Sequence, residues 1–234
     1  MEGFETRLAC LKERIRAAER AAGRNEGEVS LVAVSKTHGA VAIARAYRCG
    51  LRHFGENYLQ EAAAKQDSLG HFDIGWHFIG PIQSNKTRLV AQRFAWVHGV
   101  ERLKTAERLN AHRPDFFPRL NVCLQVNISG EASKSGVDPR EVPTLLEAMA
   151  PLPRLRLRGL MAIPAPDDRE AEQRGTFARM RELFDRVAPI YGMDTLSMGM
   201  SDDLEAAILE GSTQIRIGTA LFGARPKPIA ANNP

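Results

Sequence analysis

Residues 31–40 read LVAVSKTHGA, and this stretch indicates the fold. Leu31 to Val34 form an uninterrupted apolar run, which is typical of a strand buried on both faces, as in parallel sheets. Lys36 follows at the carboxyl end of that run. The first expectation is therefore a parallel sheet covered by helices, and the lysine at the strand end is the first candidate functional residue.

Strand-like and helix-like segments alternate along the rest of the chain. The strand-like runs occupy residues 29–36, 52–57, 74–80, 94–100, 121–129, 155–163, 194–199 and 213–223. Helix-like patterns occupy residues 40–50, 58–67, 84–93, 102–113, 140–150, 170–189 and 202–211. Eight strands separated by helices predict parallel βαβ units that close into a single (β/α)8 TIM-type barrel. An open doubly wound sheet is the alternative, but no strand leads into a G-x-G-x-x-G turn.

The N-terminal segment predicts an extra helix before the first strand. Its apolar residues recur at spacings of three and four, at positions 4, 8, 11, 15, 18 and 22. This periodicity is typical of an amphipathic helix that packs on the outside of the domain. We expect one domain over residues 1–225 and a loose tail over residues 226–234.

The composition is that of an ordinary globular protein. Of 234 residues 44% are apolar, and 32 basic against 28 acidic residues give a net charge of +4. The basic residues are scattered, which argues against nucleic acid or membrane partners. No apolar segment is long enough for a membrane span, no signal-peptide core is present, and three widely spaced cysteines suit reduced thiols. We expect a cytoplasmic protein, and a monomer because no apolar surface stripe is evident.

Lys36 has two interpretations. In the first, it extends its ammonium group from the strand end to water. In the second, partial burial favours the neutral amine, which attacks a carbonyl group and forms a Schiff base. Functional residues of (β/α)8 barrels lie at the carboxyl ends of the strands, where Lys36 falls.

Two turns near the C-terminus have the properties of phosphate-binding sites. In TLSMGMSDDLEAAILEG, residues 195–211, a strand leads into a helix whose best N-cap is Ser201. A helix N-terminus with a nearby hydroxyl can hold a phosphate. Gly218 and Thr219 end the last strand, where glycine lets the backbone approach an anion and threonine adds a hydroxyl. Barrel closure would bring both turns beside Lys36. Purely structural roles for Ser201 and Gly218 stay open.

Arg216 lies two residues before Gly218 on the last strand. The strand period of two places its side chain toward the barrel interior, where a buried arginine needs a partner. If the ligand contains a pyridine ring, the guanidinium can donate a hydrogen bond to the ring nitrogen and keep it unprotonated. The ring would then be a weakened electron sink.

Seven stretches together are similar to one known family. They are AVSKTH, HFGENYLQE, WHFIGPIQSNK, NISGEASKSG, RGLMAIP, TLSMGMSDDLEAAI and STQIRIGTALFGAR. They resemble the pyridoxal phosphate homeostasis proteins, also called the YggS or PROSC family, over about residues 5 to 225. The resemblance implies a barrel like the N-terminal domain of alanine racemase, with pyridoxal 5'-phosphate (PLP) held as a Schiff base on Lys36.

The resemblance also implies roles for the other candidate residues. Ser201, Gly218 and Thr219 would hold the phosphate. Arg216 would face the pyridine nitrogen, and Asn57 would lie near the polar substituents of the ring. The position two residues after the lysine, often a second lysine in bacterial members, is His38 here. This departure puts in doubt any second cofactor-handling role at that position.

The resemblance implies a protein that carries or buffers PLP, with apo-PLP enzymes as transient partners, rather than an enzyme. A racemase needs two bases on opposite faces of the substrate carbon, and the related enzyme takes one of them from a second domain. The chain ends after the eighth unit, so we expect carbanion chemistry to be disfavoured. The alternatives are a low-activity PLP-dependent racemase or transaminase, and a Schiff-base aldolase without a cofactor.

The remaining polar residues predict no second site. The six histidines show no H-E-x-x-H spacing, so no metal site is expected. His77 is either a core residue or a residue of the barrel mouth. Residues 83–86 are predicted to begin a helix. The loop SGEASKSG, which contains Lys134, is a candidate for covering the cofactor or passing it to a client.

Overall fold

The computed structural model describes residues 3–131 and 135–223. In these ranges eight strands, all parallel, pair in chain order and close into a barrel through β8 and β1. The strands are β1 (Ser30–Val34), β2 (His53–Glu56), β3 (Gly75–Phe78), β4 (Trp96–Val100), β5 (Leu120–Gln125), β6 (Leu155–Met161), β7 (Thr195–Ser197) and β8 (Gln214–Ile217). The predicted (β/α)8 barrel is confirmed, and the open sheet is excluded because β1 and β8 are paired.

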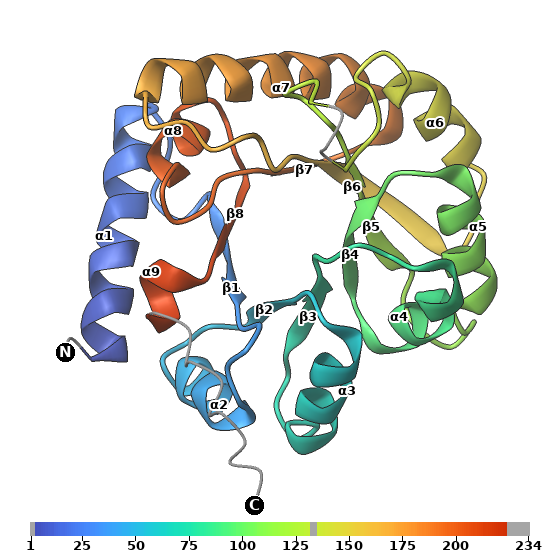
Figure 1. Ribbon diagram of the computed structural model, residues 1–234, viewed down its shortest axis with the longest axis horizontal. Helices are drawn as coiled ribbons and strands as arrows, with labels where there is room; N and C mark the ends of the chain where they lie inside the picture. Colours follow the sequence, from blue (N-terminus) through green and yellow to red (C-terminus); the bar gives the residue numbers. More distant parts are fainter. Residues whose placement is uncertain (1–2, 132–134, 224–234) are drawn as a thin grey trace, which may run out of the picture.

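Helices surround the barrel on its outer side (Figure 1). They are α1 (Phe4–Ala21), α2 (Ala40–Arg48), α3 (Leu59–Ser68), α4 (Thr87–Arg93), α5 (Leu103–His112), α6 (Val142–Met149), α7 (Glu170–Tyr191), α8 (Leu204–Leu209) and α9 (Thr219–Phe222), with a 3-10 turn η1 (Ser84–Lys86) ahead of α4. Strand β1 shows why this arrangement suits the sequence. Val32, Ala33 and Val34 are all buried, because helices cover one face and the barrel interior covers the other.

The predicted N-terminal helix is present as α1, and its apolar stripe is buried at Phe4, Leu8, Leu11, Ile15 and Ala18. The helix packs against α8 and α9 (Figure 1). Arg7 Nε donates to the Leu221 carbonyl at 2.9 Å, and Arg14 Nε donates to Glu205 at 2.6 Å. Helix α1 therefore fixes the chain on both sides of β8.

The last predicted strand, residues 213–223, is wrong in its second half. Pairing of β8 with β1 ends at Ile217, which faces Ala33. The N–H groups of Leu221 and Phe222 donate to the Gly218 carbonyl, so the chain turns at once into α9. The carboxyl end of β8 is therefore a strand-to-helix turn.

The predicted N-cap of α8 is also wrong. The helix begins at Leu204, with Asp203 as its N-cap residue, because residues 201–203 form a turn. The Asp203 carboxylate accepts the Met200 N–H at 2.5 Å and holds that turn. The Ser201 hydroxyl instead accepts the N–H of Ala220 in α9 at 3.3 Å. Ser201 thus links the turns after β7 and β8.

No helix in the described ranges combines the length and the apolar character needed to cross a membrane. The predicted tail over residues 226–234 and the predicted domain boundary at residue 225 lie outside the described residues. Lys134 of the predicted covering loop lies outside them as well.

Candidate functional site

A cavity of about 230 Å³ lies at the carboxyl ends of the strands. Its lining includes the six residues expected to bind the cofactor: Lys36, Asn57, Ser201, Arg216, Gly218 and Thr219. The remaining wall comes from Val34, Ile79, Ile163, Met200 and Asp202. The barrel thus brings together residues from distant parts of the sequence, from Val34 to Thr219.

Lys36 follows β1 in a tight turn. The Ser35 N–H donates to the Gly55 carbonyl of β2 at 3.0 Å, and the His38 N–H donates to the Ser35 carbonyl at 3.0 Å. Thr37 has a φ of 68°, and among the residues that the structure describes it is the single non-glycine residue with a positive φ. A β-branched residue is strained in this region, so contacts from neighbouring elements must enforce this backbone.

Arg216 is a buried cation on β8, opposite Val32 of β1, and is 4% exposed. Its guanidinium donates to Ser197 Oγ at 2.8 Å and to the Ala162 carbonyl at 2.9 Å. Both acceptors are neutral. Burial lowers the pKa of Arg216 to about 10, with the Asp203 carboxylate opposing that effect, so the side chain is charged at neutral pH. The cavity therefore has a fixed positive charge in its wall.

A chain of hydrogen-bonded side chains supports Arg216 from inside the barrel. This histidine chain consists of His53, His77, His98 and Ser197. Facing ring nitrogens are 3.0 Å apart between His53 and His77 and 2.9 Å apart between His77 and His98. His98 Nδ1 lies 3.1 Å from Ser197 Oγ. The chain thus extends from the amino end of β2 to the guanidinium, and His77 is a core residue.

The histidine chain carries no net charge at neutral pH in its buried part. Burial lowers the pKa of His98 to about 3, with a smaller effect from the Arg216 charge. Burial, with His98 as the next cause, holds the pKa of His77 well below its ordinary value of 6.5. A neutral imidazole has one donor and one acceptor nitrogen, so adjacent rings can donate in sequence along the chain.

Ser201, Gly218 and Thr219 form one side of the cavity, where two turns meet. The turn after β7 needs Gly199, whose φ is 96° and where an added Cβ would lie 2.7 Å from Ala207 Cβ. This glycine lets the chain reverse so that Ser201 reaches Ala220 of α9. Two residues with hydroxyl groups, Ser201 and Thr219, therefore lie together in the cavity wall beside Gly218, which is a suitable setting for an anion.

Asn57 follows β2 and lines the cavity with an unpartnered polar atom. Its Oδ1 is buried and has no hydrogen-bond partner in the part of the chain that the structure describes. Gly80 keeps Asn57 in place, since a Cβ at position 80 would lie 2.4 Å from the Asn57 carbonyl oxygen. A buried acceptor without a partner is costly, so Asn57 Oδ1 is a candidate to accept a hydrogen bond from a ligand.

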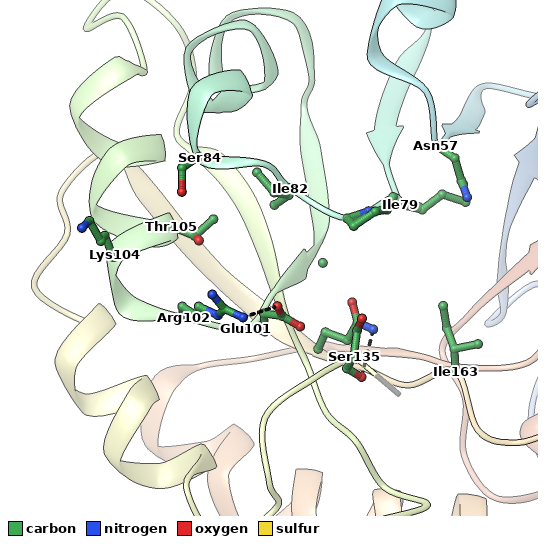
Figure 2. A pocket seen from close by; sticks show the side chains of 14 residues that line it. Asn57, Ile79, Ile82, Ser84, Glu101, Arg102, Lys104, Thr105, Ser135 and Ile163 are labelled. Atoms are coloured by element: carbon green, nitrogen blue, oxygen red, sulfur yellow. Dashed lines mark hydrogen bonds and ion pairs between the residues drawn. The ribbon is translucent and has the colours of Figure 1, made fainter. Parts of the chain in front are cut away.

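A second pocket of about 360 Å³ adjoins the first and shares Asn57, Ile79 and Ile163 with it. Figure 2 shows these three side chains together at one side of the second pocket, while Arg102 and Lys104 lie at the other. Two polar side chains of its wall are bound by the chain: Gln125 Nε2 donates to the Ser135 carbonyl, and Glu101 accepts the Gly136 N–H.

Sequence reasoning missed the support behind Arg216. The available signal was the presence of His77, His98 and Ser197 inside runs that are otherwise apolar. Such residues need hydrogen-bond partners when they are buried, and the period of two puts them on the interior face. Nothing in a single sequence states which of them lie at the same level of the barrel.

Comparisons with known proteins agree with this geometry. The family model for the alanine racemase N-terminal domain matches residues 6–226. The chain is 60% identical over 225 residues to a pyridoxal phosphate homeostasis protein of Pseudomonas aeruginosa, covering 96% of this chain and 97% of the relative. It is 52% identical to the pyridoxal phosphate homeostasis protein of Escherichia coli K12, covering 96% of this chain and 98% of the relative.

Among solved structures, PipY of Synechococcus elongatus with PLP bound superposes with a TM-score of 0.82. It is 38% identical, and the match covers 94% of this chain and 100% of that one. Both the sequence match and the superposition extend over nearly the whole barrel. The chain therefore belongs to the pyridoxal phosphate homeostasis protein family, within the alanine racemase N-terminal domain fold.

Proposed function

We propose that this protein binds pyridoxal 5'-phosphate in the 230 Å³ cavity and carries or buffers it for PLP-dependent enzymes. The cofactor would be held reversibly as a Schiff base on Lys36. In that attachment the lysine amine adds to the aldehyde carbon, a C=N bond forms, and the aldehyde oxygen leaves as water. PLP bound to PipY, a structural relative, supports this choice of cofactor.

The other lining residues would divide the recognition of the cofactor between them. Ser201 and Thr219 would donate their hydroxyls to the phosphate, and Gly218 would let it approach the backbone. Arg216 is positively charged and can donate to an acceptor such as a pyridine nitrogen. Asn57 Oδ1 is a free acceptor for a ligand hydroxyl.

The observation that carries the proposal is the convergence of chemically different groups on one cavity. Residues that carry an amine, a guanidinium, two hydroxyls and an amide all line it. PLP contains an aldehyde, a pyridine nitrogen, a phosphate and a phenolic hydroxyl, so each of its polar groups has a partner of the right chemistry here.

A carrier role fits the charge of Arg216. PLP enzymes that stabilise carbanions commonly use a protonated pyridine nitrogen, and a guanidinium cannot accept that proton. The relatives are named as homeostasis proteins rather than as enzymes. The protein would therefore keep free PLP low and release it to apo-enzymes without a committed reaction of its own.

The site is tested by trapping the bound cofactor. Reduction with borohydride after addition of PLP fixes a C=N bond, and peptide mass mapping then locates the adduct. We expect the adduct on the peptide that contains Lys36, and its loss in Lys36→Ala. Lys104→Ala, which changes a lysine of the second pocket, is the matched control and should keep the adduct. An unchanged adduct in Lys36→Ala would refute the assignment.

The carrier role has its own test. The PLP-loaded protein is incubated with a panel of amino acids in deuterated water, and exchange of the α-proton is followed by NMR. We expect no exchange at turnover rates. Rapid exchange with any amino acid would establish a racemase or transaminase in place of a carrier.

A further inference from the structure

Helix α3 supplies a buried cation, Lys65, that contacts the turn containing Lys36. Lys65 is 5% exposed. Its Nζ lies 2.7 Å from Glu56 Oε1, 2.5 Å from Glu61 Oε1 and 2.8 Å from the Ser35 carbonyl oxygen. We call Ser35, Glu56, Glu61 and Lys65 the Lys65 network. A lysine is rarely buried without partners of this kind, so the network is a built feature of the fold.

The Lys65 network holds the backbone on both sides of Lys36. On the preceding side, Lys65 Nζ donates to the Ser35 carbonyl, and the Ser35 hydroxyl donates to Glu56 Oε1 at 2.6 Å. On the following side, the Thr37 N–H donates to Glu61 Oε1 at 2.7 Å. Glu61 Oε1 is also the atom that contacts Lys65. The two halves of the turn are thus tied to one ammonium group.

These contacts account for the strained conformation of Thr37. A left-handed backbone at a β-branched residue persists only where the surroundings over-determine it. Thr37 itself is exposed, so burial of its side chain does not hold it there. The hydrogen bond from its N–H to Glu61 is a charge-assisted contact that the left-handed turn makes.

We propose that Glu61 and Lys65 are positioning residues that hold residues 35–37 in this turn and so direct Lys36 into the cavity. This inference rests on the proposed function, in which Lys36 carries the cofactor. Neither residue lines the cavity, so both would act through the Lys36 backbone rather than on the ligand. Loss of the Glu61 contact would let Thr37 relax and would turn the lysine amine away from the aldehyde.

Glu61 is the residue to change, because its side chain is 31% exposed and its loss leaves Lys65 paired with Glu56. Glu61→Ala removes the acceptor of the Thr37 N–H, whereas Glu61→Gln keeps an acceptor oxygen. Glu28→Ala is the matched control, since Glu28 also accepts a backbone N–H, from Asn25, and pairs with a cation, Arg24, but does not line the cavity. Thr37→Gly, combined with Glu61→Ala, lets the backbone at position 37 adopt a positive φ without the hydrogen bond to Glu61.

The first readout is the rate at which the Schiff base forms with PLP. Loss of one charge-assisted hydrogen bond corresponds to about a tenfold effect, so we expect Glu61→Ala to slow formation about tenfold. Glu61→Gln and Glu28→Ala should stay within about twofold of the wild-type protein, well under the tenfold that one such bond represents. The double variant Glu61→Ala/Thr37→Gly should regain most of the rate.

The second readout is hydrogen exchange of the Thr37 amide in ligand-free protein, which does not involve the cofactor. We expect protection in the wild-type protein and in Glu61→Gln, and its loss in Glu61→Ala. A wild-type rate and retained protection in Glu61→Ala would overturn the inference, as would a slow rate that Thr37→Gly fails to restore. If PLP never attaches to Lys36 while Thr37 protection depends on Glu61, the proposed function fails and the role of Glu61 in holding the turn stands.

Discussion

Two polar networks support Lys36 and Arg216 in the cavity wall, and the two networks differ in charge. The Lys65 network beneath Lys36 is ionic, with an ammonium between two carboxylates. The histidine chain behind Arg216 is hydrogen-bonded through neutral imidazoles. An ionic network can hold a strained turn, because charge-assisted hydrogen bonds are stronger than neutral ones. A neutral chain can orient a cation without cancelling its charge.

The difference is consistent with what each supported residue is proposed to do. Lys36 needs a fixed direction, and the Lys65 network supplies it through backbone contacts. Arg216 needs to keep its positive charge available to the cavity, and a carboxylate in direct contact would have neutralised it. In the described residues no carboxylate forms an ion pair with Arg216. The comparison predicts that the two networks respond differently to mutation and to pH.

The largest expected effect comes from the Lys65 network, in the variant Lys65→Met. Burial raises the pKa of Glu56, and the hydrogen bond from Lys65 opposes this. Without Lys65 the buried carboxylate is either unpaired or forced to bind a proton, so we expect a loss of about 3–5 kcal/mol in the free energy of unfolding. Urea unfolding measures it.

Adding Glu56→Gln to Lys65→Met sharpens that result. The double variant buries no charge at this position, so it should be more stable than Lys65→Met alone. If Lys65→Met lowers the free energy of unfolding by less than about 1 kcal/mol, as for exposed ion pairs, the Lys65 network does not stabilise the fold as proposed.

The next effect is a pH dependence of the free energy of unfolding that arises from the histidine chain. The pKa of His98 is about 3 in the folded protein against an ordinary value of 6.5. Between these values the unfolded chain binds a proton that the folded protein does not, so the free energy of unfolding falls as the pH drops below about 6.5. One such site contributes at most about 1.4 kcal/mol per pH unit.

His98→Asn tests this contribution, because asparagine has no charge in either state. Urea unfolding at pH 7 and pH 5 should give a smaller loss of stability on acidification in the variant than in the wild-type protein. Titrating groups that do not interact with His98 cancel in that difference, whereas His77, which contacts it, responds together with it. Equal pH dependence in both proteins would mean that His98 is not held neutral by the fold.

The smallest expected effect is from Thr37→Gly alone. Glycine adopts a positive φ without the strain that threonine has there, but it also increases the entropy of the unfolded chain. We expect a net gain in stability of at most about 1 kcal/mol. A thermal or urea midpoint below that of the wild-type protein, by the equivalent of more than about 1 kcal/mol, would contradict the view that Thr37 is strained.

The barrel was predictable because its signals are local. Apolar runs, helical periodicity and their alternation define β1 to β8 without any knowledge of contacts between distant residues. The cavity residues were predictable for a related reason: Lys36, Gly218 and Thr219 stand just after strands, and strand ends meet at one edge of a closed parallel sheet.

What could not be predicted depends on packing between elements. Glu61 and Lys65 form an i, i+4 pair, which in a sequence resembles an exposed helix face. Lys65 is buried against Ser35, which follows β1, and Glu56 of β2, and the helical spacing alone does not show these contacts. The N-cap of α8 was misassigned because Ser201 and Asp203 are both good caps, and the link from Ser201 to Ala220 decides between them.

The most direct test of the account is the visible absorbance spectrum of the purified protein, before and after addition of PLP, with Lys36→Ala alongside. We predict a band at about 420 nm, where the Schiff base of the cofactor absorbs, in the wild-type protein and none in the variant. A band of equal strength in Lys36→Ala, or no band in the wild-type protein under any condition, would contradict the claim that Lys36 holds the cofactor.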